Sequence, residues 1–167
     1  MRNLKPSGIT LLELMVVLAI ISILLLIAIP SLSHLFIRHQ KSTQINQLAD
    51  QIYYLRSEAM TRSSPIVFCK SNDKTTCSGE WSDGQIAFID ITGTRQRDPD
   101  DILIRSWGPL KQAKLQWRGF VSNDYLLIHP SGLGNAMAGS FHYQHQSDQT
   151  FKPVISLNRV GRVRVIF

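Results

Sequence analysis

The strongest constraint on this chain is an almost unbroken apolar run near its N-terminus, from Ile9 to Ile29. Glu13 is the only charged residue in the run, and Pro30 follows it directly. A helix rises about 1.5 Å per residue, so the run makes a rod of roughly 31 Å, which matches the hydrocarbon thickness of a bilayer. We therefore expect a membrane-spanning helix over residues 9–30.

Glu13 and the short segment before the run make this span unusual. A carboxylate inside a span costs about 2.5–3.5 kcal/mol, so it is protonated, snorkels to the interface, or has a partner or function. Residues 1–8 are basic and end in small residues, whereas a secretory signal carries its cleavage site after a shorter apolar region. Cleavage between Gly8 and Ile9 would create an ammonium one helical turn from Glu13, where the opposite charges can neutralise each other.

The segment Ser7-Gly8-Ile9-Thr10-Leu11-Leu12-Glu13-Leu14 resembles the prepilin peptidase motif of type IV pilins and type II secretion pseudopilins, although Ile9 replaces the usual Phe. The resemblance implies that a prepilin peptidase removes leader 1–8 after Gly8 and that Ile9 is then N-methylated. It also implies that Glu13 and Pro30 serve assembly with other pilins. The protein is then expected in the inner membrane as a single-pass protein with a periplasmic head, which reaches the cell surface in the assembled filament.

Residues 31–64 predict a second, amphipathic half of the helix. Apolar residues recur at helical spacing through this stem. They are Ile45, Leu48, Ile52, Leu55 and Ala59. Pro30 removes a helical hydrogen bond and predicts a bend or loosening there. The polar face is not especially basic, which favours packing against a C-terminal domain over a membrane-surface helix. We expect the helix to end before Ser63-Ser64-Pro65.

Residues 65–167 change to the pattern of short strands separated by turns, which predicts a β-rich head. The expected strands are Ile66–Cys69, Gln85–Ile91, Ile102–Ser106, Lys114–Phe120, Tyr125–His129, Ser140–His145, Pro153–Leu157 and Arg162–Phe167. The predicted fold class is α+β and pilin-like, with a long N-terminal helix whose lower half is wrapped by one twisted antiparallel sheet.

Cys69 and Cys77 are the only cysteines, with seven residues between them. Because the head of such a membrane protein faces the oxidising side, we expect a disulfide, worth about 2.5 kcal/mol in the chain-entropy model. A zinc site is disfavoured because two thiols lack further ligands at metal spacing.

Charge is distributed unevenly along a chain whose formal net charge is +6. Residues 31–101 hold eight Lys or Arg against nine Asp or Glu, a net of −1, whereas residues 102–167 hold eight against two, a net of +6. This asymmetry favours a polyanionic partner, either nucleic acid or a membrane surface.

The chain closes on Gly161-Arg162-Val163-Arg164, followed by Val165, Ile166 and Phe167. Strand alternation places Arg162 and Arg164 on one face about 6.6 Å apart, and Val163 faces the core. Two guanidinium groups at this spacing can each fork onto a phosphate. The alternative is a solvated edge strand whose arginines prevent edge-to-edge aggregation.

Several features of the head resemble FimT-type minor pilins and the related GspH-type pseudopilins. They are Leu55-Arg56-Ser57-Glu58-Ala59, the cysteine pair, the turn from Trp81 to Gly84, and Gly161-Arg162-Val163-Arg164. The FimT resemblance implies that Gly161, Arg162 and Arg164 bind extracellular DNA non-specifically during natural transformation. Lys111, Lys114 and Arg118 are expected auxiliary contacts. The GspH resemblance implies instead a structural component near the tip of a type II secretion pseudopilus.

Other chemistry has little support in the sequence. Trp107 and Trp117 could stack on bases, but Trp117 shares its strand parity with apolar neighbours, which favours core packing. Asp98, Asp100 and Asp101 lack the glycine and distal glutamate of a calcium loop. The five histidines form no catalytic constellation, so we expect no enzyme, no metal and no cofactor.

Overall fold

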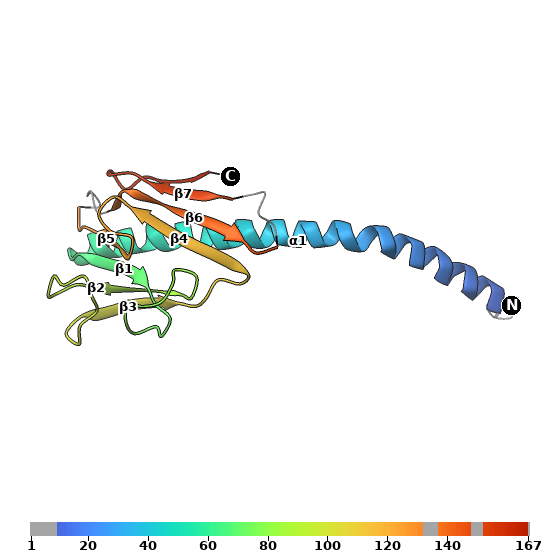
Figure 1. Ribbon diagram of the computed structural model, residues 1–167, viewed down its shortest axis with the longest axis horizontal. Coiled ribbons are helices and arrows are strands. Elements are labelled where there is room, and N and C mark those ends of the chain that lie inside the picture. Colours follow the sequence, from blue (N-terminus) through green and yellow to red (C-terminus); the bar gives the residue numbers. More distant parts are fainter. Residues whose placement is uncertain (1–9, 132–136, 148–151, 167) are drawn as a thin grey trace, which may run out of the picture. The chain divides into compact units, whose positions relative to one another are not determined.

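The computed structural model describes residues 10–131, 137–147 and 152–166 (Figure 1). The chain divides into two compact units, Met1–Gln40 and Lys41–Phe167. The first unit holds the apolar part of helix α1, and the second holds the rest of that helix together with eight strands. The predicted leader 1–8, which ends at Gly8, and the predicted methylation site Ile9 lie outside the described residues.

Helix α1 runs from Leu11 to Arg62 and is assigned without a break through Pro30. Pro30 therefore does not interrupt the helix. The bend predicted at Pro30 stays a prediction. Thr10 caps the start of the helix, because its Oγ1 accepts a hydrogen bond from the backbone N–H of Glu13 at 3.2 Å. Within α1, Leu11–Ile29 has a mean hydropathy of 3.0 and is long enough to cross a membrane.

The C-terminus of α1 confirms the predicted stop. Ser63 adopts a positive φ of 50°, and the N–H of Ser64 donates to the carbonyl of Ala59 at 3.2 Å. The N–H of Ser63 donates to the carbonyl of Met60 at 3.3 Å, which completes a Schellman motif. Pro65 then prevents the helix from continuing.

The apolar face of the stem is buried in the head, as its helical spacing predicts. Its five apolar residues, from Ile45 to Ala59, are at most 4% exposed. They form one hydrophobic core with side chains from both sheets of the head, such as Phe68 and Phe141. The alternative of a membrane-surface helix is therefore wrong.

The eight strands form two four-stranded antiparallel sheets, not the single sheet that we expected. Sheet A has the order β3-β2-β1-β5 and sheet B the order β4-β6-β7-β8 (Figure 1). In chain order the strands are β1 Ile66–Lys70, β2 Gln85–Ile89, β3 Ile102–Trp107, β4 Ala113–Gly119, β5 Tyr125–Ile128, β6 Gly139–His145, β7 Val154–Leu157 and β8 Val163–Ile166. The head has two sheets because β5 pairs with β1 and not with β4. The alternation of residues within a strand does not specify which distant strand it pairs with.

Strands β1 and β2 of sheet A are buried on both faces, whereas the edge strand β3 is largely exposed. Ile66 and Phe68 of β1 join the main core, whereas Val67 and Cys69 join a second cluster that is completed by side chains of β2 and β5. This burial explains the continuous apolar run of β1, because a strand covered on both sides does not need to alternate. Cys77 packs against the second cluster.

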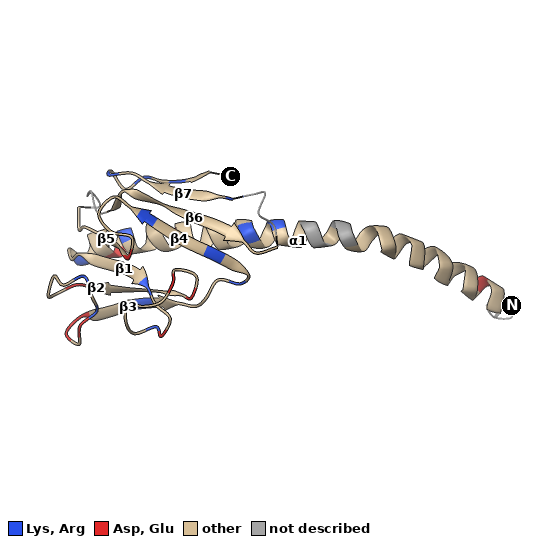
Figure 2. Cartoon of the chain, in the orientation of Figure 1, with Lys and Arg blue, Asp and Glu red and all other residues tan. Residues whose placement is uncertain are grey.

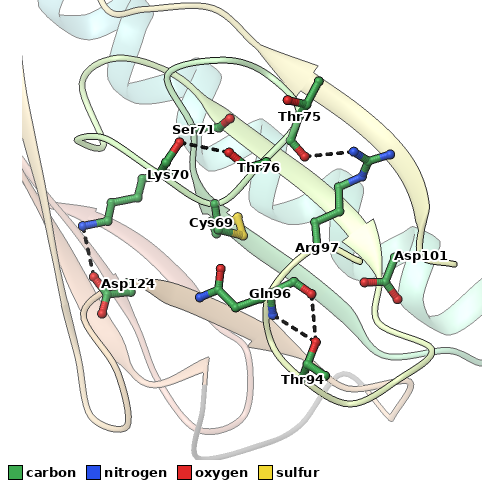
Figure 3. The surroundings of a disulfide bond; sticks show 12 residues. Cys69, Lys70, Ser71, Thr75, Thr76, Thr94, Gln96, Arg97, Asp101 and Asp124 are labelled. Carbon is green, nitrogen blue, oxygen red and sulfur yellow. Dashed lines mark hydrogen bonds and ion pairs between the residues drawn. A yellow bond between two sulfur atoms is a disulfide. The ribbon is translucent and has the colours of Figure 1, made fainter. Parts of the chain in front are cut away.

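The predicted disulfide is confirmed: Cys69 and Cys77 are bonded, with their Cα atoms 5.6 Å apart. A neighbouring loop supports the loop that the disulfide closes, since Arg97 Nη1 donates to the carbonyl of Thr75 at 2.9 Å (Figure 3). Lys70, next to Cys69, forms an ion pair with Asp124 at 3.0 Å.

Candidate nucleic-acid interface

The two faces of sheet B differ sharply in chemistry. Along β4 the burial alternates strictly, so that Leu115 and Trp117 point into the core while Lys114, Gln116 and Arg118 are exposed. We call the solvent side the outer face. On the strands it consists of Lys114, Gln116, Arg118, Ser140, His142, Gln144, Val154, Ser156, Arg164 and Ile166. None of these positions holds a carboxylate.

Arg162 and Arg164, which we call the arginine pair, are both exposed. Val163 between them is 8% exposed and belongs to the core, and Val165 packs partly against it. The predicted alternation is therefore confirmed for these residues, although β8 begins at Val163, one residue later than predicted. Phe167 lies outside the described residues. Among the described residues, none forms a hydrogen bond or ion pair with either guanidinium group.

A tight turn from Asn158 to Arg162 places the arginine pair at the start of β8. Gly161 has a φ of 72° and its N–H donates to the carbonyl of Asn158 at 2.9 Å, the geometry of a turn closed by a left-handed residue. The Asn158 side chain accepts from the N–H groups of Val160 at 3.1 Å and Arg162 at 2.8 Å. Gly161 therefore serves the turn through its backbone, and Asn158 is a second determinant of the turn.

The stem helix braces this turn from beneath. Arg56 Nη1 donates to the carbonyl of Gly161 at 2.6 Å, and its Nη2 donates to the carbonyl of Val160 at 3.3 Å. The hydroxyl of Tyr53, one helical turn earlier, donates to the carbonyl of Val163 at 3.3 Å. Sequence reasoning did not assign this role to Arg56, because the contact joins residues 105 positions apart.

Arg118 lies in the same transverse row of sheet B as Arg164. The register pairs Arg118 with Ser140, Ser140 with Ser156, and Ser156 with Arg164. Three steps of about 4.8 Å between neighbouring strands separate the two arginines by about 14 Å. The two residues between them, Ser140 and Ser156, are small and partly exposed.

The two lysines predicted as auxiliary contacts lie farther from the arginine pair. Lys114 shares the outer face with Arg118 but is four residues away along β4, or about 14 Å. Lys111 precedes β4 and lies beyond the end of that strand that is distant from Gly119; its carbonyl accepts from Gln44 Nε2 at 3.2 Å. The structure therefore groups Arg118 with the arginine pair and does not group Lys111 with them.

The charge around the outer face is predominantly positive. Arg159 and Lys152, both exposed, add cations beside the strands. In Figure 2 the acidic segments of the head lie mainly in the loops around β1, β2 and β3, whereas β4 carries basic segments. His142 lies between β4 and β7, and its pKa is lowered by burial and, secondarily, by the charge of Arg118.

A groove of about 1200 Å³ runs beside β4 and has a mixed lining. Lys114, Arg118 and Lys152 contribute cations, but carboxylates from the Trp81 turn and from Asp124 line the same space. A polyanion therefore meets a more uniformly positive surface at the β8 edge of sheet B than inside this groove.

The structure also locates the aromatic and histidine residues considered from the sequence. Trp117 is 1% exposed and Trp107 is partly buried against the core. Both side chains therefore pack in the core and do not form an exposed surface for stacking on bases. His142 and His145 lie on opposite faces of β6, as predicted, and His145 is fully buried. Within the described residues, no group of three metal-ligating side chains is present.

The carboxylates considered for calcium instead organise their own loop. Asp98 Oδ2 accepts from the hydroxyls of Thr92 and Thr94, both at 2.7 Å. These two hydrogen bonds, that of Thr94 first, lower the pKa of Asp98. Asp101 accepts from two backbone N–H groups, those of Ile91 and Asp98, both at 2.9 Å.

Comparison with known families identifies the protein class. Residues 44–161 match the profile of the family described as type II transport protein GspH. This chain belongs to the GspH family. Residues 4–29 match the prokaryotic N-terminal methylation motif, which covers Gly8, Ile9 and Glu13. The comparison with curated protein sequences found no relative of this GspH-family chain.

Two solved structures share the fold of this GspH-family protein. Both are crystal structures of the type IV minor pilin FimU from Pseudomonas aeruginosa. One has a TM-score of 0.61 at 16% identity and covers 77% of this chain and 90% of its own. The other has a TM-score of 0.58 at 16% identity, covering 75% and 91%. The pilin-like α+β fold, a long helix packed on antiparallel sheets, is therefore established.

Family membership carries four consequences for this protein. It is a minor pilin or pseudopilin of the type IV pilus and type II secretion class, and like other pilins it is a structural protein and not an enzyme. The methylation motif implies processing by a prepilin peptidase and assembly into a filament with other pilins. The N-terminal helix anchors it in the inner membrane, with its head in the periplasm or at the surface.

Proposed function

We propose that this protein is a FimT-type minor pilin that binds extracellular DNA through the outer face of sheet B, for uptake in natural transformation. The observation that carries the proposal is the exposed arginine pair, which shares a carboxylate-free face with Arg118. Planar guanidinium groups bind phosphate oxygens in pairs, so three of them on one face fit a phosphodiester backbone.

The expected binding is sequence-tolerant. The described outer face presents strands and turns and offers no helix for insertion into a major groove, so contacts to phosphates dominate. The arginine pair at the β8 edge makes the principal contact, and Arg118 extends it across the sheet. Lys114 lies farther along the same face and adds a weaker contact. Lys111 contributes least because it lies beyond the end of β4.

The test uses the full chain in a non-ionic detergent and fluorescently labelled random-sequence DNA. Arg162→Gln/Arg164→Gln removes two charges at the proposed site, whereas Arg62→Gln/Lys74→Gln removes two exposed charges elsewhere. Because phosphate contacts dominate, we expect the first double variant to lose most of its affinity and the second to retain it. Equal losses in both variants, with folding intact, would reduce the interaction to a general effect of net charge.

The alternative function is that of a GspH-type pseudopilin at the tip of a type II secretion pseudopilus. The match to the GspH family over residues 44–161 favours it. In that case the arginines prevent other chains from pairing with the edge strand of sheet B. The protein then does not slow the migration of DNA in a gel, even at low salt. Deletion of the gene would then impair protein secretion and leave transformation unchanged.

A further inference from the structure

Phe120 is an exposed aromatic side chain at the end of sheet B where the turn carries the arginine pair. It follows β4 directly and is 68% exposed, although most aromatic rings of the head lie in the core. A single exposed apolar side chain is normal on a protein surface, so Phe120 indicates a ligand site only through the cations that lie near it.

The backbone places Phe120 in a row with Arg162. The N–H of Phe120 donates to the carbonyl of Ala138 at 2.9 Å, one position beyond the pairing of Gly119 with Gly139. At the other edge, the N–H of Asn158 donates to the carbonyl of Arg162 at 3.3 Å. Phe120 and Arg162 therefore lie at opposite ends of one row, two residues along each edge strand from the row that holds Arg118 and Arg164.

Arg159 links the two edges of this row. Its guanidinium carbon lies 5.3 Å from the centroid of the Phe120 ring, within cation–π range. Arg159 follows β7 and Phe120 follows β4, so the contact crosses β6. The ring remains 68% exposed despite this contact, which leaves surface for a second planar group.

We infer that Phe120 and Arg159 form a stacking site for an unpaired base, so that the outer face of sheet B prefers single-stranded over double-stranded DNA. This inference rests on the proposed function and specifies the form of its ligand. Bases are accessible for stacking in a single strand, whereas in a duplex they are covered by their neighbours. Phosphates of the same strand reach Arg118, Arg162 and Arg164 along these two rows of the outer face.

The positive charge of the outer face favours DNA over the apolar surface of another pilin as the ligand of Phe120. Four exposed arginines lie on the outer face and its turn: Arg159 against the ring, Arg118 two residues before it on β4, and Arg162 and Arg164 at the opposite edge of the sheet. The one carboxylate in the loop between β4 and β5, that of Asp124, is paired with Lys70. A hydrophobic partner would have to desolvate these cations, whereas a nucleic acid neutralises them.

The test compares the full chain in non-ionic detergent on three labelled probes of about 16 nucleotides, a length suited to one small binding domain. The probes are oligothymidine, a duplex, and an abasic strand that keeps the phosphates but lacks bases. We expect Phe120→Ala to weaken oligothymidine binding about fivefold or more, with little change for the duplex and the abasic strand. Phe120→Trp should retain oligothymidine binding, because a flat ring remains.

Val121→Ala is the matched control, because Val121 is the next residue and is 55% exposed. It should leave all three affinities unchanged. The inference is overturned if Phe120→Ala weakens all probes equally or none, or if Phe120→Ala binds DNA normally but no longer assembles with other pilins. Failure of the unaltered chain to bind any probe would overturn the proposed function itself, and is distinguishable from these outcomes.

Discussion

Arg56 Nη1 donates a hydrogen bond to the carbonyl oxygen of Gly161 at 2.6 Å, which ties the stem helix to the turn before the arginine pair. Arg56 is only partly exposed, and its Nη2 reaches the carbonyl of Val160 as well. One side chain thus satisfies two carbonyls of a turn that is otherwise held by Asn158 and its own backbone. The position of the proposed DNA contact depends on this brace.

Replacing Arg56 with alanine should therefore destabilise the head. Hydrogen bonds from a charged donor contribute about 1.5–3 kcal/mol, and partial exposure reduces that, so we expect a loss of about 1–2 kcal/mol in the free energy of unfolding. Arg62→Ala is the control, because its ion pair with Glu58 is exposed and worth about 0.5 kcal/mol or less. Denaturant unfolding followed by tryptophan fluorescence measures both; equal effects would contradict the brace.

Removing the disulfide with Cys69→Ala/Cys77→Ala should lower the free energy of unfolding by about 2.5 kcal/mol, from the chain entropy of the short loop that it closes. The lost sulfur of the buried Cys69 adds a packing cost to this value. A reductant should destabilise the unaltered protein and leave the double variant unaffected. If reduction leaves the unfolding midpoint of the unaltered protein in place, the disulfide does not constrain the head.

Acid should loosen the loop closed by that disulfide through Asp73. Its carboxylate accepts from the N–H and hydroxyl of Thr76 and from the N–H of Thr75, and these bonds hold the pKa of Asp73 well below its usual range. A lowered folded-state pKa contributes stability that is fully present above the unfolded pKa of about 3.9 and is lost as the pH falls toward the folded value.

We therefore expect the protein to lose stability below about pH 4, and Asp73→Asn to lose less over the same interval, because the asparagine carries no charge to protonate. Thermal unfolding at a series of acidic pH values gives the slope of stability against pH for each of the two proteins. Parallel curves for the two proteins would show that the Asp73 hydrogen bonds contribute nothing to acid sensitivity.

Trimming of the N-terminus tests the processing step. In cells that contain the prepilin peptidase, we expect Gly8→Ala to leave residues 1–8 attached, because the resemblance to the prepilin peptidase motif places the cleavage directly after Gly8. The mass of the isolated protein reports the cleavage, and Ser7→Ala, which keeps Gly8, serves as the control. Normal trimming of the Gly8→Ala chain would contradict the assignment of the cleavage site.

Local patterns in the sequence predicted most elements of this fold. The 3.6-residue spacing of the stem and the strict alternation of β4 are local signals, so they identified the buried faces of both elements. The motif around Glu13 and the spacing of Cys69 and Cys77 are equally local. The eight strand predictions agree with the structure to within two residues at each end.

The pairing of distant elements was not predictable in the same way. The division into two sheets depends on the pairing of β5 with β1. The brace depends on the hydrogen bond between Arg56 and Gly161, which lies 105 residues later in the chain. The placement of Phe120 beside Arg159 likewise follows from the order β4-β6-β7. Each of these is a long-range contact whose partners have no shared pattern in the sequence.

The salt dependence of DNA binding tests the central claim most directly. Each phosphate neutralised on duplex DNA contributes a slope of about −0.9 to the logarithm of affinity against the logarithm of salt concentration. With Arg118, Arg162 and Arg164 in contact, we predict a slope of about −2.7, which should fall to about −0.9 in Arg162→Gln/Arg164→Gln. A slope that is unchanged in this double variant would contradict the account, because the arginine pair would then not contact the phosphates.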